Sequence, residues 1–201
     1  MIKNLIFDFG NVLVRHDLVP MLTRFWGGDT EKVQQSIALL SDKNFVDDCD
    51  CGVKPFAQII KEKQQQYPDF AEMLQYYADN TFDEIMGEVE GMRALLTLLK
   101  QKGYGLYGLT NWGGGIYQVM ETYDIFRLLD GQVISSEEHI IKPNRAIYLR
   151  LCEKYALSPA ECLFTDDKQV NVDGAKSVGM HGIVFVNAEQ YAKDLQSFMH
   201  D

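Results

Sequence analysis

Acidic, hydroxyl and lysine side chains follow apolar runs at four places in this 201-residue sequence. Asp8 comes directly after the apolar run Leu5-Ile6-Phe7, and the later positions are Thr110-Asn111, Lys142 and Asp166-Asp167. A carboxylate can attack phosphorus, paired carboxylates can hold Mg2+, and lysine or threonine can bind phosphate oxygens. This set of residue types predicts phosphoryl-group chemistry, which depends mainly on positioning and on stabilising charge.

Mg2+ is the cofactor that this combination predicts. An attacking carboxylate and a phosphate group are both negatively charged, so they repel each other. A Mg2+ ion held by carboxylates and water lowers that repulsion. Lys142 adds a positive point charge and precedes the expected start of a helix, whose free N–H groups also favour an anion. Thr110 and backbone N–H groups are left to bind the remaining phosphate oxygens.

Each stretch taken alone also has a purely structural interpretation. Asp8 caps a turn, Thr110-Asn111 forms a turn, and Lys142 is a solvated loop lysine. Asp166-Asp167 opens a helix, where the dipole favours acids, and Asn171 hydrogen-bonds back to Asp167 from one helical turn further on. The chemical interpretation becomes the stronger one only if the four stretches meet at one place.

Alternating strands and helices from Glu90 onward would bring these stretches together. Leu5-Ile6-Phe7 has no helical period, which fits a strand buried on both faces. Further strands are expected over 104–109, 132–134, 162–164 and 182–186, with helices between them and a last helix whose buried face includes Met199. The pattern predicts an α/β fold with a doubly wound, mostly parallel, Rossmann-like sheet covered on both faces. In such a sheet the carboxyl ends of the strands share the edge at which ligands bind.

A helical segment interrupts this alternation directly after the first strand. Amphipathic helices are expected after Asp17 as N-cap, from Thr30, in the first turn after Pro55 and over 70–77, whereas 41–52 is acidic, solvated and irregular. No strand pattern occurs between 16 and about 86. The predicted organisation is a Rossmann-like core made of 1–15 and 87–201, with an all-helical insertion over 16–86.

The composition restricts the classes of partner. With 46% hydrophobic and 24% charged residues the chain is an ordinary globular protein, and its net charge of −10 argues against nucleic acid and anionic membranes. The N-terminus has no signal-peptide pattern, and no apolar run approaches the ~20 residues of a membrane span. The four cysteines match no standard zinc spacing. We expect a cytoplasmic protein with no protein partner indicated, and an anionic small substrate is compatible with the net charge because a local pocket can be positive on an acidic protein.

The ordered set of motifs resembles that of the haloacid dehalogenase-like (HAD) hydrolases over most of the chain. The first motif is Phe7-Asp8-Phe9-Gly10-Asn11-Val12, in an Asp-x-Gly-Asn-Val form similar to that of some sugar-phosphate phosphatases. The other motifs are Leu109-Thr110-Asn111, Lys142-Pro143, and Phe164-Thr165-Asp166-Asp167 with Asn171 and Ala175. By this resemblance, 16–86 would be the cap that closes over the substrate.

The resemblance also implies a role for each residue of the predicted site. Asp8 would be the catalytic nucleophile, which forms an aspartyl-phosphate intermediate. Asp8, the Gly10 carbonyl and Asp167 would bind Mg2+, and Asp166 would assist directly or through water. The phosphate-binding residues would be Thr110, Asn111 and Lys142, of which Lys142 is also catalytic. The implied protein is a Mg2+-dependent phosphatase for a small phosphorylated metabolite, with an aldose 1-phosphate favoured.

One departure from the family pattern concerns proton transfer. Many family phosphatases carry a second Asp two positions after the nucleophile as general acid and base, where this sequence has Gly10. General acid–base help is typically worth ~10²–10⁴ in rate. We therefore expect a preference for leaving groups that need little protonation, such as an anomeric sugar oxygen. His16 is an alternative acid, although a hinge or surface position is its simpler interpretation.

Three other functions share parts of this residue set. A 2-haloacid dehalogenase would not use Mg2+, so the acid pair Asp166-Asp167 and Lys142 favour the phosphatase. A phospho-aspartate regulatory module also gathers an acid pair, a Thr and a Lys, but its acid pair comes early in the chain and it has no inserted cap. A catalytically weak phosphate-binding module is the hypothesis that Gly10 motivates. Mg2+-dependent turnover that disappears in Asp8→Asn distinguishes the phosphatase from all three.

Overall fold

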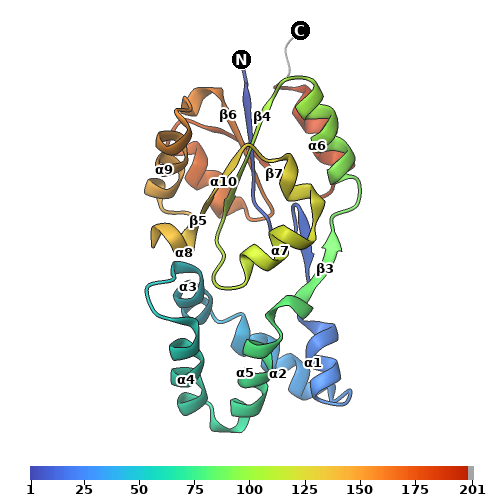
Figure 1. Ribbon diagram of the computed structural model, residues 1–201, viewed down its shortest axis with the longest axis vertical. Helices are drawn as coiled ribbons and strands as arrows, with labels where there is room; N and C mark the ends of the chain where they lie inside the picture. The colour runs from blue at the N-terminus through green and yellow to red at the C-terminus, as the bar shows by residue number, and fades with distance from the viewer. Residues whose placement is uncertain (199–201) are drawn as a thin grey trace.

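Five short strands form a parallel sheet at the centre of the core (Figure 1). The computed structural model describes residues 1–198. The strands are β1 (Asn4–Phe7), β4 (Gly105–Thr110), β5 (Gly131–Ile134), β6 (Cys162–Asp166) and β7 (His181–Val184), in the order β5-β4-β1-β6-β7. Every neighbouring pair is parallel. β1 is therefore central, and the strand order reverses beside it, which is where a doubly wound sheet forms its ligand-binding crevice.

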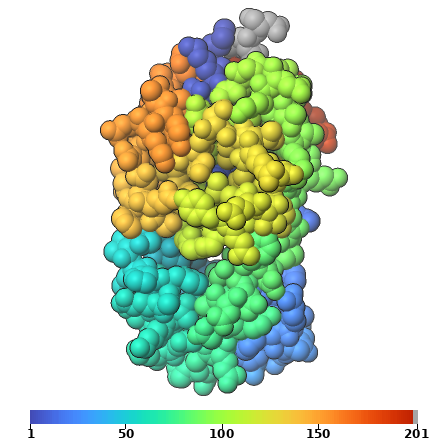
Figure 2. Space-filling model, viewed as in Figure 1, coloured from blue at the N-terminus to red at the C-terminus, as the bar shows by residue number. Residues whose placement is uncertain are grey.

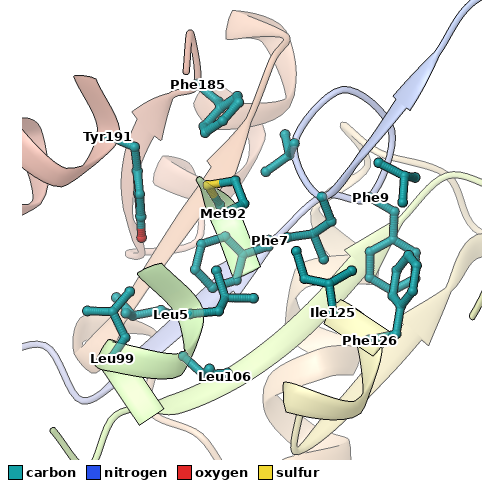
Figure 3. Close-up of a cluster of buried hydrophobic side chains, with 14 of the residues drawn as sticks. Leu5, Phe7, Phe9, Met92, Leu99, Leu106, Ile125, Phe126, Phe185 and Tyr191 are labelled. Atoms are coloured by element: carbon teal, nitrogen blue, oxygen red, sulfur yellow. The ribbon is translucent and has the colours of Figure 1, made fainter. Parts of the chain in front are cut away.

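Helices cover both faces of the sheet, because strands that are apolar on both sides need two apolar partners. Leu5 and Phe7 pack towards one face and Ile6 towards the other, since successive strand side chains alternate. Figure 3 shows Phe7 on the first face, near Met92 and Tyr191. The first face carries α6 (Met92–Gln101), α7 (Ile116–Thr122), the 3-10 helix η3 (Asp124–Leu128) and α11 (Ala188–Gln196), and the second carries α9 (Arg145–Tyr155) and α10 (Gln169–Lys176).

The predicted α/β class with a mostly parallel sheet is confirmed. Each strand predicted for the core is present within about two residues of its predicted bounds. The last helix is present as well, although Met199, predicted on its buried face, lies outside the described residues. Within residues 1–198, none of the helices combines the length and the apolar character that crossing a membrane requires.

A block of helices lies beyond the carboxyl edge of the sheet, between the short strands β2 (Val14–His16) and β3 (Ile85–Glu88) (Figure 1). These helices bury an apolar cluster of their own, which includes Met21, Leu22 and Met73. In Figure 2 the block, coloured blue to green, packs directly against the core. The block contains α1 (Val19–Phe25), α2 (Thr30–Leu40), α3 (Lys43–Cys51), α4 (Phe56–Gln66), α5 (Ala71–Asp79) and the 3-10 helices η1 (Pro68–Phe70) and η2 (Thr81–Glu84).

The prediction that 16–86 contains no strand was wrong at both ends. β2 and β3 pair antiparallel, with Val14 opposite Glu88 and His16 opposite Ile85. Each strand is only three or four residues long, too short for an alternating pattern to appear in the sequence. Their pairing with each other, rather than any local propensity, makes them strands, and it ties the two ends of the helical block together.

Two segments predicted to be irregular are helical. The acidic segment 41–52 contains α3, whose N-cap Asp42 accepts a hydrogen bond from the Phe45 N–H at 3.1 Å. The loop expected before Lys142 contains a single helical turn, α8 (Ser135–Glu138). Asp17 is also not the N-cap of α1: that position is Leu18, although the Asp17 carboxylate accepts from the Val19 N–H at 2.9 Å. A dense acidic run hides the helical period of α3, and one turn is too short to show a period.

Gly108 in β4 allows the Phe9 ring to lie flat against the sheet, and it gives a test of this packing. A Cβ at position 108 would lie 2.6 Å from Phe9 Cζ and 3.2 Å from Gln132 Cβ. We expect Gly108→Ala to lower the free energy of unfolding by about 1–3 kcal/mol through overpacking, measured by urea denaturation. The matched control is Gly114→Ala, where a Cβ meets nothing within 4 Å and the change should stay within about 0.5 kcal/mol. Equal stabilities of the two variants would contradict the packing described.

Candidate active site

Three carboxylates converge at the carboxyl ends of β1 and β6. Asp8 directly follows β1, and its N–H continues the sheet ladder by donating to the Thr165 carbonyl at 2.9 Å. Asp166 ends β6, and Asp167 follows it. One carboxylate oxygen from each of Asp8, Asp166 and Asp167 lies within 4.8 Å of the others. The sheet register therefore brings together acids that are far apart in the sequence, as the parallel fold predicted.

Lys142 lies buried between two of these acids. Its Nζ is 2.8 Å from Asp8 Oδ1 and 2.7 Å from Asp166 Oδ2, and it also donates to the Leu109 carbonyl at 3.0 Å. These three partners use all three donors of the ammonium group. With the residue only 3% exposed, Lys142 is held in a fixed position rather than solvated in a loop.

Asn111 and Thr110 come from the end of β4 and differ in what they contact. The Asn111 side chain pairs with the Lys142 backbone, accepting from its N–H at 2.7 Å and donating to its carbonyl at 3.1 Å. Asn111 therefore positions the lysine. The Thr110 hydroxyl is buried and has no hydrogen-bond partner among the described residues. The Thr165 hydroxyl, in β6, is likewise buried and unpaired, and such hydroxyls are unfavourable unless a partner is supplied.

Asp166 and Asp167 have different surroundings. Both Asp166 oxygens accept from Asn171 Nδ2, at 3.0 and 3.1 Å, and Oδ1 also accepts from the Lys168 N–H at 2.8 Å. The expectation that Asn171 bonds back to Asp167 was therefore wrong, because Asn171 faces the buried end of β6 instead. Asp167 is half-buried and forms no ion pair within residues 1–198. Asp166 is a saturated, buried carboxylate, and Asp167 presents a free one to the pocket.

The charges of the site are reflected in its pKa values. Burial raises the pKa of Asp8 to about 6, Lys142 opposes that rise, and Asp166 adds to it. Burial also disfavours the charged form of Asp166, but Lys142 and the N–H donors outweigh the effect of burial and lower the pKa of Asp166. The pKa of Asp167 is raised by burial and by the charge of Asp166. The pKa of Lys142 is raised because its two carboxylates outweigh its burial. Lys142 pairs directly with two of the three acids, and Lys168 acts on Asp167 without forming an ion pair among the described residues. The three carboxylates are thus an oxygen donor set with surplus negative charge, which fits a divalent cation such as Mg2+.

A pocket of about 560 Å³ opens from this cluster towards the helical block. Asp8, Gly10, Lys142 and Asp167 line its inner end. Its outer walls come from the helical block and combine polar and charged side chains with an aromatic and aliphatic set, which consists of Leu18, Leu40, Phe45, Val46, Phe56 and Tyr77. The shape suits a ligand whose charged end meets the acids and lysine and whose remainder meets an apolar wall.

His16, the alternative acid, also lines this pocket but is engaged elsewhere. Its Nε2 lies 3.2 Å from Glu84 Oε2, and the pair bridges β2 to the end of η2. Burial lowers the pKa of His16, but Glu84 outweighs the burial and leaves the pKa above its usual value. Asp17 N–H donates to the Glu84 carbonyl at 2.8 Å on the same side. These contacts place His16 at the junction between the core and the helical block.

Sequence reasoning missed one polar residue of the pocket, Asp50. The acidic run around it was expected to be solvated, yet Asp50 is half-buried and lines the same pocket as Asp8. Asp50 was missed because the sequence pattern did not reveal that it lies on a helix. Once α3 is recognised, Asp50 falls four residues after Val46, on the face that turns towards the core.

Comparison with known proteins settles the family. A family model described as "Hydrolase: haloacid dehalogenase-like hydrolase" matches residues 2–179. The chain belongs to this family. Among curated HAD-type relatives, it is 29% identical over 107 residues to flavin mononucleotide hydrolase 1 of Arabidopsis thaliana, an alignment covering 53% of this chain and 44% of the relative. It is 36% identical over 93 residues to the sesquiterpene phosphatase astK of Aspergillus oryzae, covering 46% and 47%. The chain thus aligns with a little under half the length of each relative.

Solved HAD structures share the whole fold at low sequence identity. A HAD-like family hydrolase from Porphyromonas gingivalis superposes with a TM-score of 0.77 at 20% identity, over 100% of this chain and 99% of that one. A HAD family enzyme from Bacteroides thetaiotaomicron, in a magnesium complex, gives 0.75 at 18% identity, over 97% and 98%. These likenesses establish the HAD fold, sheet and helical block together.

Replacing Lys142 by an uncharged residue tests whether its positive charge stabilises the buried carboxylates. We expect Lys142→Met to lower the free energy of unfolding by about 3–5 kcal/mol without Mg2+, because buried carboxylates lose their cation. The control is Lys61→Met, which removes an exposed lysine of α4 and should change stability by no more than about 0.5 kcal/mol. Adding Asp166→Asn to Lys142→Met should recover part of the loss. Urea denaturation at neutral pH measures all four proteins, and a Lys142→Met protein as stable as Lys61→Met would contradict the assignment.

Proposed function

We propose that this HAD hydrolase is a Mg2+-dependent phosphatase that acts on a small phosphorylated metabolite. The observation that carries the proposal is the cluster of Asp8, Asp166 and Asp167 with the buried Lys142, at the inner end of a pocket. The phosphatase-named relatives support it. So does a Bacteroides thetaiotaomicron HAD enzyme solved with magnesium and inorganic phosphate.

Asp8 is the nucleophile of the proposed reaction. One of its carboxylate oxygens bonds to phosphorus while the bond from phosphorus to the leaving oxygen breaks, and that oxygen takes up a proton. Water then attacks the aspartyl phosphate, which releases inorganic phosphate and restores Asp8. Lys142 holds Asp8 in place and stabilises the added negative charge, with Thr110 as a further donor.

Asp8, Asp167 and the Gly10 carbonyl are the proposed Mg2+ ligands. When bound, the ion neutralises the phosphate and makes the phosphorus easier to attack. Asp166 has both oxygens occupied by protein donors, so its proposed part is to orient Lys142 and to assist through water. The block over 16–86 is the proposed cap, with 1–15 and 87–201 as the catalytic core.

We favour a sugar phosphate as the substrate, and among sugar phosphates an aldose 1-phosphate. A Cβ at Gly10 would lie 4.0 Å from Trp112 Cζ3, so a side chain has room there, yet the sequence supplies no acid. His16 is paired with Glu84. A leaving oxygen that is stable with little protonation compensates for this absence.

The nucleophile and the metal are tested together. We expect wild-type protein to hydrolyse p-nitrophenyl phosphate with Mg2+, and EDTA to abolish the activity. Asp8→Asn should reduce the rate by a factor on the order of 10³ or more, because it removes the attacking group. Asp48→Asn, an exposed acid on α3, should leave the rate unchanged. Chloride release from a 2-chloroacid in EDTA, without phosphatase activity, would overturn the proposal in favour of a dehalogenase.

Metal binding also has a readout that does not depend on turnover. Mg2+ at about 100 times its Kd should raise the thermal midpoint of the wild-type protein by roughly 5–10 °C. Asp167→Asn should remove most of this shift, and Asp48→Asn should retain it. The same shift in Asp167→Asn as in the wild type would exclude Asp167 as a ligand.

The choice of leaving group is tested with two isomers. Glucose 1-phosphate and glucose 6-phosphate differ in which oxygen leaves, and the 6-oxygen needs protonation more. We expect the single-turnover rate of phosphate transfer to Asp8 from the 1-phosphate to exceed that from the 6-phosphate by about tenfold or more, within the range that general acid help supplies. Equal single-turnover rates would remove the argument from Gly10 while leaving the phosphatase assignment intact.

A further inference from the structure

Asp50 is a carboxylate of the pocket that is not paired directly with any group among the described residues. It lies in the last full turn of α3 and lines the pocket together with Asp8 and Lys142. Within residues 1–198 its carboxylate forms neither a hydrogen bond nor an ion pair; its contact to the protein is through the backbone. The other acids of the helical block that line the pocket are paired, Glu84 with His16 and Asp47 with Lys43.

The backbone around Asp50 is fixed to the core. The Asp50 carbonyl accepts from Ser135 Oγ at 2.6 Å, and the Cys51 carbonyl lies 3.0 Å from His139 Nδ1. Gly52 follows in the left-handed region at φ 64°, and a Cβ there would lie 2.6 Å from the Ser136 carbonyl oxygen. Because α3 meets the core this closely, the Asp50 side chain has a defined place in the pocket rather than that of a solvated surface acid.

Charges from both sides of the pocket act on Asp50. Burial raises its pKa to about 7, Lys168 and Lys142 oppose the rise, and Asp8 and Asp47 add to it. A desolvated carboxyl in this position gains when a ligand offers it an O–H or N–H donor. A second negative charge on the ligand would instead be repelled by Asp50, and Lys168, which also lines the pocket, would weaken this repulsion.

The walls near Asp50 define the rest of the ligand. Phe45, Phe56 and Tyr77 from the helical block and Trp112 from the core are the aromatic members of the lining. Aromatic faces accommodate the C–H faces of a sugar ring or another flat organic group. The leaving-group end of the pocket therefore combines an apolar wall with one acceptor.

We propose that Asp50 selects the leaving group: it accepts a hydrogen bond from a hydroxyl or ammonium group of the substrate and excludes phosphate monoesters that carry a second anionic group. This rests on the proposed phosphatase function and narrows its substrate class. Asp50 acts on the part of the substrate that leaves, whereas Asp8, Lys142 and Thr110 act on the phosphate.

Two substrates that differ only in this charge test the proposal. Glucose 1-phosphate carries a CH2OH group where glucuronate 1-phosphate carries a carboxylate. For the wild-type protein we expect kcat/KM to favour glucose 1-phosphate by about tenfold or more, as unpaired like charges in an interface are strongly unfavourable. Asp50→Asn should bring the ratio of the two kcat/KM values towards one, and Asp50→Lys should invert it. Asp48→Asn, two residues away and exposed, should keep the wild-type ratio.

The outcomes separate this proposal from the one on which it rests. Thermal unfolding of each variant first establishes that it is folded, and the isosteric Asp50→Asn keeps the test available if Asp50→Lys is not. Hydrolysis of p-nitrophenyl phosphate together with an unchanged substrate ratio in Asp50→Asn would overturn the role of Asp50 alone. No Mg2+-dependent hydrolysis of any monoester would overturn the phosphatase function, and the role of Asp50 with it.

Discussion

The surplus of negative charge at the carboxyl edge of the sheet is the constraint on which the rest of the site depends. Buried charges are costly unless they are paired and hydrogen-bonded. Lys142 meets that requirement for Asp8 and Asp166 at 2.8 and 2.7 Å, and Asn111 fixes the backbone of Lys142 in turn. Asp167 forms no ion pair in the part of the chain that the structure describes. The cluster is electrostatically incomplete by itself, which is what a site for a divalent cation and a phosphate requires.

The parallel sheet makes this arrangement possible without local sequence proximity. Phe7 pairs with Thr165 on one side and Gly108 on the other, so the next residue, Asp8, lies beside the ends of both neighbouring strands. Asp166 and Thr110 occupy those ends. The buried strands must be in register to fill the two apolar layers, and a shift by one residue would move Phe7 to the wrong layer. Core packing and site geometry are therefore set by the same register.

The elements that position the acidic end of the candidate site could be predicted from the sequence. Each of them is a buried strand followed by a polar residue, and both features are local: Asp8 after β1, Thr110 at the end of β4, and Asp166 at the end of β6. The hydrogen-bond partners of individual side chains were harder to predict from the sequence. The link from Asn171 to Asp166, and that from Asn111 to the Lys142 backbone, depend on where separate elements pack. The pair β2–β3 and the helix α3 were missed because non-local pairing and an acidic run concealed them.

The leaving-group end of the pocket is harder to predict for a physical reason. Its residues come from helix faces of the inserted block, and a face is recognised only once the helix and its packing are known. The block meets the core on two sides, through β2–β3 with His16 and Glu84, and through α3 on α8. The pocket lies between these two junctions, and charges on its half-buried residues act more strongly than they would at a fully exposed surface. A single carboxylate such as Asp50 can therefore have a large effect on which ligand binds, although nothing in its immediate sequence distinguishes it from the solvated acids beside it.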